Sequence, residues 1–319
     1  MLVDLKLSMV EIIITILCSL LAIAFFTIAE RKLMASIQRR KGPNVTGFWG
    51  TLQAIADGLK LIFKEIVIPI RANWILFLLA PSITLVIGLV LWVFIPFSDL
   101  NYLTNFDFSL LFIYAISSIG VYGIIGAGWA SNSKYAFLGS LRSAAQLISY
   151  EVSIGLLLLP VAICANSYNL IEIVTQQSRA WFCIPLLPVT IIFFVSLLAE
   201  TNRAPFDLPE AEAEIVAGYN VEYSSIAFAM FFLAEYSNIL WLSVVIAICF
   251  FGGWLAPLSI LPQSSLWLII KTLVVCFLII KTRANYPRYR YDQLISLGWK
   301  TFLPISLGYL LFVVGVMIF

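Results

Sequence analysis

The amino-acid sequence predicts an all-α, polytopic membrane protein with about eight transmembrane helices and an interfacial amphipathic helix in the first loop. Of the 319 residues, 62% are hydrophobic and 11% are charged, whereas soluble domains are about 45–50% apolar and about 25% charged. The apolar residues form runs of about 20, the length of a helix that spans a bilayer. Most charges lie in the loops between these runs. The composition excludes a water-soluble enzyme, a disordered protein and a nucleic-acid binder.

The hydrophobic runs place the spanning helices in chain order. The first run lacks the basic segment and small-residue cleavage site of a signal peptide, so we expect it to be a span. The alternative is seven spans, because the last run is short and has Pro304 near its start. We expect residues 1–319 to form a single integral membrane domain. The predicted spans cover residues 9–29, 74–97, 110–129, 138–164, 181–199, 226–251, 266–280 and 302–319.

The amphipathic helix is predicted over residues 50–66, in the loop after the first span. Its apolar and polar residues recur at helical spacing on different faces. The segment is too short and too charged to span a membrane, and Trp49 precedes it as an aromatic anchor. It is either a simple surface anchor or a doorway for a lipid-soluble molecule. Its apolar face contains Leu52, Ile55, Ala56, Leu59, Ile62, Phe63 and Ile66, and its polar face contains Gln53, Asp57, Lys60 and Lys64.

The basic residues are concentrated on one side of the predicted membrane. Alternate loops, at 30–73, 130–142, 200–225 and 281–301, contain 16 of the 19 Lys and Arg residues. We call this side the basic face; the positive-inside rule orients it to the cytoplasm or the mitochondrial matrix. The chain has no Arg- and Ser-rich transit peptide, and it is very hydrophobic for import. We therefore expect the mitochondrial inner membrane, with a bacterial plasma membrane as the alternative.

The sequence offers no ligand set for a redox centre or a metal. It has no histidine, and its five cysteines form no CxxC pair, so neither bis-His haem nor a clustered iron–sulfur site is expected. No Gly-rich dinucleotide or flavin fingerprint follows a strand. We predict no metal, haem, flavin or iron–sulfur group in this chain. Any electrons must travel on another molecule.

Two acids, Glu151 and Glu235, lie inside predicted spans, each about ten residues from the start of its helix. A charge at mid-span costs about 2.5–3.5 kcal/mol on insertion scales, and such residues usually face the bundle interior on a proton or ion path. The alternative is a structural hydrogen bond to a neighbouring helix. For Glu235, Asn238 lies one helical turn later and is a candidate partner.

Two loops of the basic face carry further signals. The 198–225 stretch holds six acids around one base, Arg203, and acids this close titrate as a group that can hold and pass on protons. The alternative is helix capping by Asp207 and Glu210. In the 283–300 stretch Arg and Tyr alternate, which suits either anionic lipid headgroups or an acidic partner surface. The six acids of the 198–225 stretch are Glu200, Asp207, Glu210, Glu212, Glu214 and Glu222.

Four stretches resemble the NADH dehydrogenase subunit 1 family, the quinone-chamber membrane subunits of respiratory complex I. They are AERKLMASIQRRKGPNVTGFWGTLQAIADGLKLIFKE (29–65), GWASNSKYAFLGSLRSAAQLISYEVS (128–153), LAETNRAPFDLPEAEAEIVAGYNVEYSS (198–225) and RANYPRYRYDQLISLGWK (283–300). The hydrophobic spans between them fall in the order expected for the family, so the resemblance covers essentially the whole chain.

The resemblance implies an enzyme subunit without its own redox centre, in which ubiquinone enters from the bilayer. It also implies antiporter-like helices at about 74–251, hydrophilic quinone-reducing partner subunits on the matrix face, membrane-arm subunits laterally, and lipids. The implied proton and coupling path comprises Glu151, Glu200, Asp207, Glu210, Glu212, Glu214 and Glu235. The implied quinone chamber comprises Glu30, Arg31, Asp57, Lys60, Arg203, Phe206 and Arg283.

Two positions depart from the family pattern. Ala54 stands where many relatives have proline, and IIKT precedes Arg283 where many relatives have a tryptophan-containing run. A homologous subunit of membrane-bound hydrogenases is one alternative, which ETNRAPFDLPEAEAE and YPRYRYDQL disfavour. A stand-alone proton or cation antiporter explains Glu151 and Glu235 but not the large basic face. A purely structural anchor predicts that the buried acids tolerate neutral replacement.

Overall fold

The computed structural model describes residues 2–99, 102–207, 218–257 and 261–318. This part of the chain consists of helices and loops, without strands, which confirms the all-α class. A π-helical turn at Gly298–Phe302 joins the last two helices. The helices are α1 (Leu2–Ile37), α2 (Gln53–Phe63), α3 (Trp74–Val90), α4 (Ser109–Ala130), α5 (Lys134–Ala165), α6 (Leu170–Gln176), α7 (Leu187–Glu200), α9 (Ser225–Cys249), α10 (Ser265–Asn285), α11 (Tyr291–Leu297) and α12 (Leu303–Ile318).

Seven helical segments of the described chain are long and apolar enough to cross a membrane, against about eight predicted. The difference falls at the predicted 181–199 span. There, α7 starts at Leu187 and has 14 residues, about 21 Å of helix, shorter than a hydrocarbon core of about 30 Å. Pro185 and Pro188 explain the late start, because proline is tolerated in the first turn of a helix but not further inside it. Pro188 lies in the first turn of α7. The seven-span alternative was wrong about which span is missing, because the last one extends from Tyr291 to Ile318.

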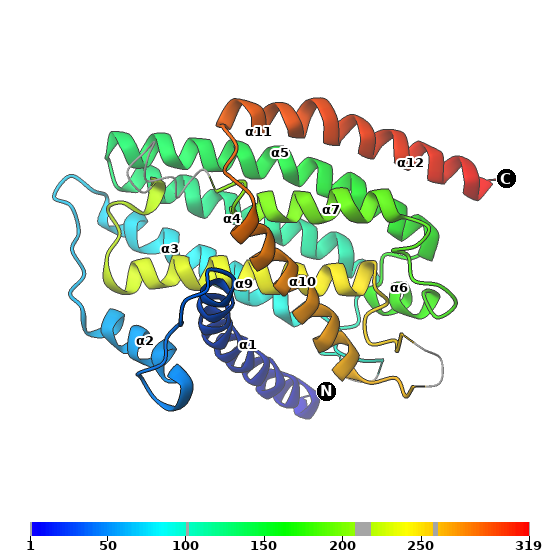
Figure 1. Cartoon of the computed structure of the whole chain (residues 1–319), viewed down its shortest axis with the longest axis horizontal. Coiled ribbons are helices and arrows are strands. Elements are labelled where there is room, and N and C mark those ends of the chain that lie inside the picture. Colours follow the sequence, from blue (N-terminus) through cyan, green and yellow to red (C-terminus); the bar gives the residue numbers. More distant parts are fainter. Residues whose placement is uncertain (1, 100–101, 208–217, 258–260, 319) are drawn as a thin grey trace.

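The helices form a bundle around α9 (Figure 1). Helix α9 packs against α1, α3 and α10, while α5 packs against α4, α7 and α12. The C-terminal half of α9 is almost completely buried, as expected for a helix that is apolar on all sides. The C-terminus lies toward the same end of the bundle as α6, and α2 lies at the other end, outside the bundle (Figure 1).

Helix α2 is the predicted amphipathic helix, and it begins three residues later than expected. Residues Phe48–Gly50 form a 3₁₀ turn before it, in which Gly50 has a φ of 72°. The start of α9 holds the other end of α2, because the single Ser225 hydroxyl hydrogen is shared between the carbonyl oxygens of Leu61, at 3.1 Å, and of Lys64, at 2.5 Å. The apolar side chains at Leu52, Ile55, Leu59, Ile62 and Phe63 are exposed.

A glycine allows α5 to touch the loop that precedes α9. A Cβ atom on Gly139 would lie 2.8 Å from Gly218 Cα and 3.0 Å from Tyr219 N. These are backbone atoms, which have little freedom to move aside. The close approach therefore depends on glycine at residue 139, which has no side chain.

We predict that Gly139→Ala destabilises the protein by about 1–3 kcal/mol, the usual cost of overpacking. The thermal unfolding midpoint of the purified complex should fall. Gly308→Ala is the matched control, because a Cβ there meets nothing within 4 Å; alanine in a helix is otherwise favourable. Equal midpoints for the two variants would contradict the prediction.

Candidate functional site

The first part of the candidate site is a buried carboxylate, Glu30, near the end of α1. Its Oε1 accepts hydrogen bonds from Arg203, at 3.0 Å, and from Arg283. Its Oε2 accepts a hydrogen bond from the Tyr236 hydroxyl at 2.6 Å. The side chains of Glu30 and Arg203 are 7% and 8% exposed. One carboxylate therefore joins α1, the loop after α7, α9 and α10.

Arg203 stays charged although it is buried. Burial lowers the pKa of Arg203, but the Glu30 carboxylate, together with Tyr236 and Glu235, outweighs this effect and holds the pKa above its ordinary value. The guanidinium also lies over the Tyr236 ring, with Cζ 4.5 Å from the ring centroid. Such a buried, hydrogen-bonded pair is costly to break from one side, because the remaining charge loses its partner.

A second ion pair joins α1 to α2. Arg31 Nη1 lies 2.7 Å from Asp57 Oδ2, and Gln53 Nε2 donates a hydrogen bond to the other oxygen of Asp57 at 2.8 Å. The side chains of Arg31 and Asp57 are 48% and 39% exposed, so this pair contributes little to stability. Its geometric effect is to hold the interfacial helix against the last turns of α1.

An open cavity of about 440 Å³ lies beside Glu30. It is bounded by the end of α1, the segment at residues 40–43, α9 and α10. Its lining is predominantly cationic, and the cationic side chains are hydrogen-bond donors for carbonyl oxygens of a ligand. The charged lining residues are Glu30, Arg31, Arg40, Lys41 and Arg283.

The loop after α7 is held by α5 and by the arginine–tyrosine segment after α10. Gln146 donates hydrogen bonds to the carbonyl oxygens of Ala199, near the end of α7, at 2.8 Å, and of Phe206, in the loop, at 2.9 Å. The Phe206 ring stacks on Tyr289 with 5.5 Å between centroids. Asp207, whose side chain is 4% exposed, accepts a hydrogen bond from Arg288 at 3.0 Å. Part of this arginine–tyrosine segment thus binds the chain's own loop. The sequence analysis considered only lipid headgroups or an acidic partner for this segment and did not include this contact.

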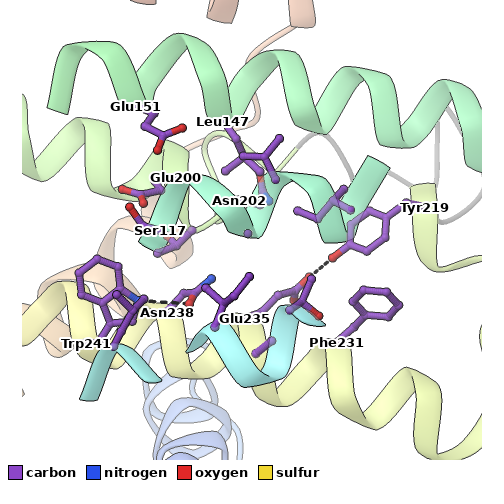
Figure 2. A pocket seen from close by; sticks show the side chains of 18 residues that line it. Ser117, Leu147, Glu151, Glu200, Asn202, Tyr219, Phe231, Glu235, Asn238 and Trp241 are labelled. Atoms are coloured by element: carbon purple, nitrogen blue, oxygen red, sulfur yellow. Dashed lines mark hydrogen bonds between the residues drawn. The ribbon is translucent and has the colours of Figure 1, made fainter. Parts of the chain in front are cut away.

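The second part of the site is an internal cavity of about 60 Å³ between α3, α4, α5, α7 and α9. Figure 2 shows Glu151 from α5 and Glu200 from α7 near Ser117 at one end of the cavity. Glu235 from α9 lies toward the other end, beside Tyr219 (Figure 2). A polar cavity of this size has room for more than one water molecule.

Three buried oxygens at this cavity lack a hydrogen-bond partner among the described residues. They are Glu151 Oε1, Glu200 Oε2 and Asn202 Oδ1. Buried polar atoms are nearly always satisfied, and where protein groups do not suffice, internal water does so. The cavity therefore has the size and the lining of a hydrated proton site.

Consecutive residues connect the two parts. Tyr236 binds Glu30, and Glu235, the residue before it, lines the internal cavity. Arg203 also binds Glu30, and Asn202, the residue before it, lines the internal cavity. The backbone therefore links the Glu30 cluster to the internal cavity at two places.

Some predicted residues lie outside these two parts. Lys60 is exposed on α2. Phe206 packs against Tyr150 and Tyr289 and is not among the residues that line the open cavity. Glu151 lies near the middle of the 32-residue α5, deeper than predicted, because α5 begins at Lys134 after the Ser133 N-cap. The predicted acids Glu210, Glu212 and Glu214 lie outside the described residues.

The described residues contain no group of three or more His, Cys, Asp or Glu side chains placed to hold a metal ion. Tyr219, Tyr236 and Asn202 are among the members of the site that were not identified from sequence. Tyr236 and Asn202 stand next to the predicted residues Glu235 and Arg203, and this adjacency was a usable signal. Nothing in the local sequence distinguishes Tyr219.

The fold and the site define a polytopic membrane protein with carboxylates of α5, α7 and α9 around an internal cavity. A family described as NADH dehydrogenase matches residues 10–314. The chain is 55% identical to NADH-ubiquinone oxidoreductase chain 1 of Chondrus crispus, over 97% of this chain and 96% of that protein. It is 57% identical to the protein of the same name from Arabidopsis thaliana, again over 97% and 96%. It is 54% identical to an NADH-quinone oxidoreductase subunit of Paramagnetospirillum magneticum, over 96% and 91%.

The chain therefore belongs to the NADH dehydrogenase family of complex I membrane subunits. This confirms the family that the four sequence stretches indicated.

Proposed function

We propose that this chain admits ubiquinone from the bilayer to a chamber at its basic face and forms the start of an acidic path that couples quinone reduction to proton movement. The names of the relatives support a quinone as substrate. The observation that carries the proposal is the adjacency of the two cavities. Residues 202–203 and 235–236 each contribute one side chain to the internal cavity and the next to the Glu30 cluster.

The proposed entrance lies at α2. The exposed apolar face of this helix sits at the membrane interface, and Asp57 ties the helix to Arg31, a residue of the open cavity. We assign the chamber to Glu30, Arg31, Asp57, Arg203 and Arg283, with Tyr236 added. Lys60 belongs to the proposed entrance helix α2, and Phe206 belongs to the loop that carries Arg203. Electrons reach the quinone from redox centres in partner subunits.

The proposed proton path begins at the Glu30 cluster and continues to Glu235, Glu200 and Glu151. The loop acids Asp207, Glu210, Glu212 and Glu214 join it on the basic face. A carboxylate can take up and release a proton, and water in the internal cavity would bridge gaps that are too long for direct transfer. In this scheme a charge change in the chamber shifts the proton affinity of the next acid along the path.

The proposed location is the mitochondrial inner membrane, with the basic face toward the matrix. Hydrophilic quinone-reducing subunits dock on this face and complete the chamber. Other membrane-arm subunits and lipids contact the lateral surface, where apolar side chains of α1, α10 and α12 are exposed.

Replacing Glu235 with Gln tests the coupling path. We expect quinone-linked NADH oxidation to fall about tenfold or more, the usual scale for loss of a proton-transfer group. NADH oxidation by an artificial acceptor upstream of the quinone should continue at the normal rate. Glu172→Gln is the control, because Glu172 is an exposed acid on α6. Helix α6 lies at the end of the bundle opposite α2 (Figure 1). Normal quinone-linked activity in Glu235→Gln would refute the path.

A further inference from the structure

Glu235 has a partner that comes from a different part of the chain. The Tyr219 hydroxyl donates a hydrogen bond of 2.7 Å to Glu235 Oε1. Tyr219 lies in a 3₁₀ turn at Gly218–Asn220, in the loop of the basic face, whereas Glu235 lies inside α9. Figure 2 shows the phenol reaching the carboxylate at the edge of the internal cavity, which both residues line.

The packing around Tyr219 fixes the position of its hydroxyl. The side chain is 2% exposed, and its ring meets Phe231 edge to face, with 5.4 Å between centroids. The backbone of the turn rests on Gly139 of α5, where no side chain intervenes. The hydroxyl therefore reaches the cavity from a buried, packed turn.

A phenol suits a carboxylate that changes its protonation state. A hydroxyl group both donates and accepts hydrogen bonds. It donates to the carboxylate when Glu235 is ionised, and it can accept from the carboxylic acid when Glu235 is protonated. An asparagine or a backbone amide could not exchange these roles at a single atom. The Glu235 side chain can thus keep one orientation through a proton-transfer cycle.

We infer that Tyr219 is a positioning residue that holds the Glu235 carboxyl group toward the internal cavity in both protonation states. This inference rests on the proposed function, because it assumes that Glu235 transfers protons. It adds a residue of the basic-face loop to the acid path, so that the position of this loop bears directly on an acid inside the membrane.

The test is Tyr219→Phe in the assembled complex, measured as quinone-linked NADH oxidation at varied ubiquinone concentration. We expect kcat to fall on the order of fivefold, the scale of one lost hydrogen bond. KM for ubiquinone should stay unchanged, because the open cavity retains its lining. Phenylalanine keeps the ring packing, and the amount of assembled complex should therefore be normal.

Tyr223→Phe is the matched control. Its hydroxyl donates to the backbone oxygen of Ala127 at 3.2 Å, and its ring also packs against Phe231. It removes a buried hydroxyl from the same cluster but does not affect a carboxylate. Equal losses of kcat in Tyr219→Phe and Tyr223→Phe would overturn the inference, because they would show a general packing effect.

The double variant Tyr219→Phe/Glu235→Gln separates this inference from the proposed function. If Tyr219 acts through Glu235, the double variant should be no slower than Glu235→Gln alone. A further fivefold loss in the double variant, or normal kcat in Tyr219→Phe while Glu235→Gln is slow, would overturn the role of Tyr219 and leave the path standing. Normal kcat in Glu235→Gln would overturn the path itself, and this inference with it.

Discussion

Replacing Glu30 with Gln is expected to destabilise the protein by about 3–5 kcal/mol, the cost of breaking a buried ion pair from one side. The change leaves Arg203 buried without its counter-charge, with Arg283 facing the same neutral amide. The loss should appear as a strong decrease in assembled complex in the membrane and a lower thermal unfolding midpoint. The remaining complex should have low quinone-linked activity, because the open cavity loses the acidic group of its lining.

Two further variants identify the cause of this loss. Asp57→Asn breaks a pair that is about half exposed, so it should reduce stability by less than about 1 kcal/mol. The double variant Glu30→Gln/Arg203→Met removes both partners of the buried pair and should recover part of the stability. A Glu30→Gln protein as stable as Asp57→Asn would show that the cluster is not a buried ion pair.

The second large effect is expected at Glu200 and Glu151, the acids near Ser117 at one end of the internal cavity. If both belong to one proton path, either single replacement by Gln interrupts it. Quinone-linked NADH oxidation should then fall about tenfold or more in each single variant. The double variant should be no slower than the slower single variant, because groups that act as a unit are not additive.

Proton uptake by vesicles that contain the complex should fall together with electron transfer in these variants. NADH oxidation by an artificial upstream acceptor serves as the internal control. Glu65→Gln provides the external control, because Glu65 is an exposed acid of the basic face. Two single variants with normal rates would mean that these acids are structural, as the alternative interpretation of the buried acids holds.

Much of the architecture could be predicted because hydrophobicity and helix periodicity are local properties. The 20-residue apolar runs located the spanning helices, and the alternating faces of residues 50–66 located α2. Boundaries were less accurate where the chain leaves the lipid phase. Helix α5 begins at Lys134 rather than near residue 138, because a short polar first turn with an N-cap carries no hydrophobic signal.

The helix α7 shows a different limit. Residues 181–199 are apolar enough to predict a full span, but the two prolines within them delay the start of the helix. The apolar composition indicated a helix from residue 181, whereas the prolines indicated a later start. The backbone constraint of proline decided where the helix begins. The short helix packs against α5, and its Phe193 and Leu197 side chains are buried in protein.

The sequence by itself determined the membrane class, the basic face, the interfacial helix and the family, and it singled out Glu30, Arg203, Glu151 and Glu235 as residues of interest. Only the tertiary structure decided which of these groups meet. Arg203 binds a carboxylate 173 residues away, and Tyr219 reaches across from a loop to an acid inside α9. Periodicity records which face of a helix avoids water, but the pairing of buried polar groups depends on how the helices pack, which no local pattern encodes.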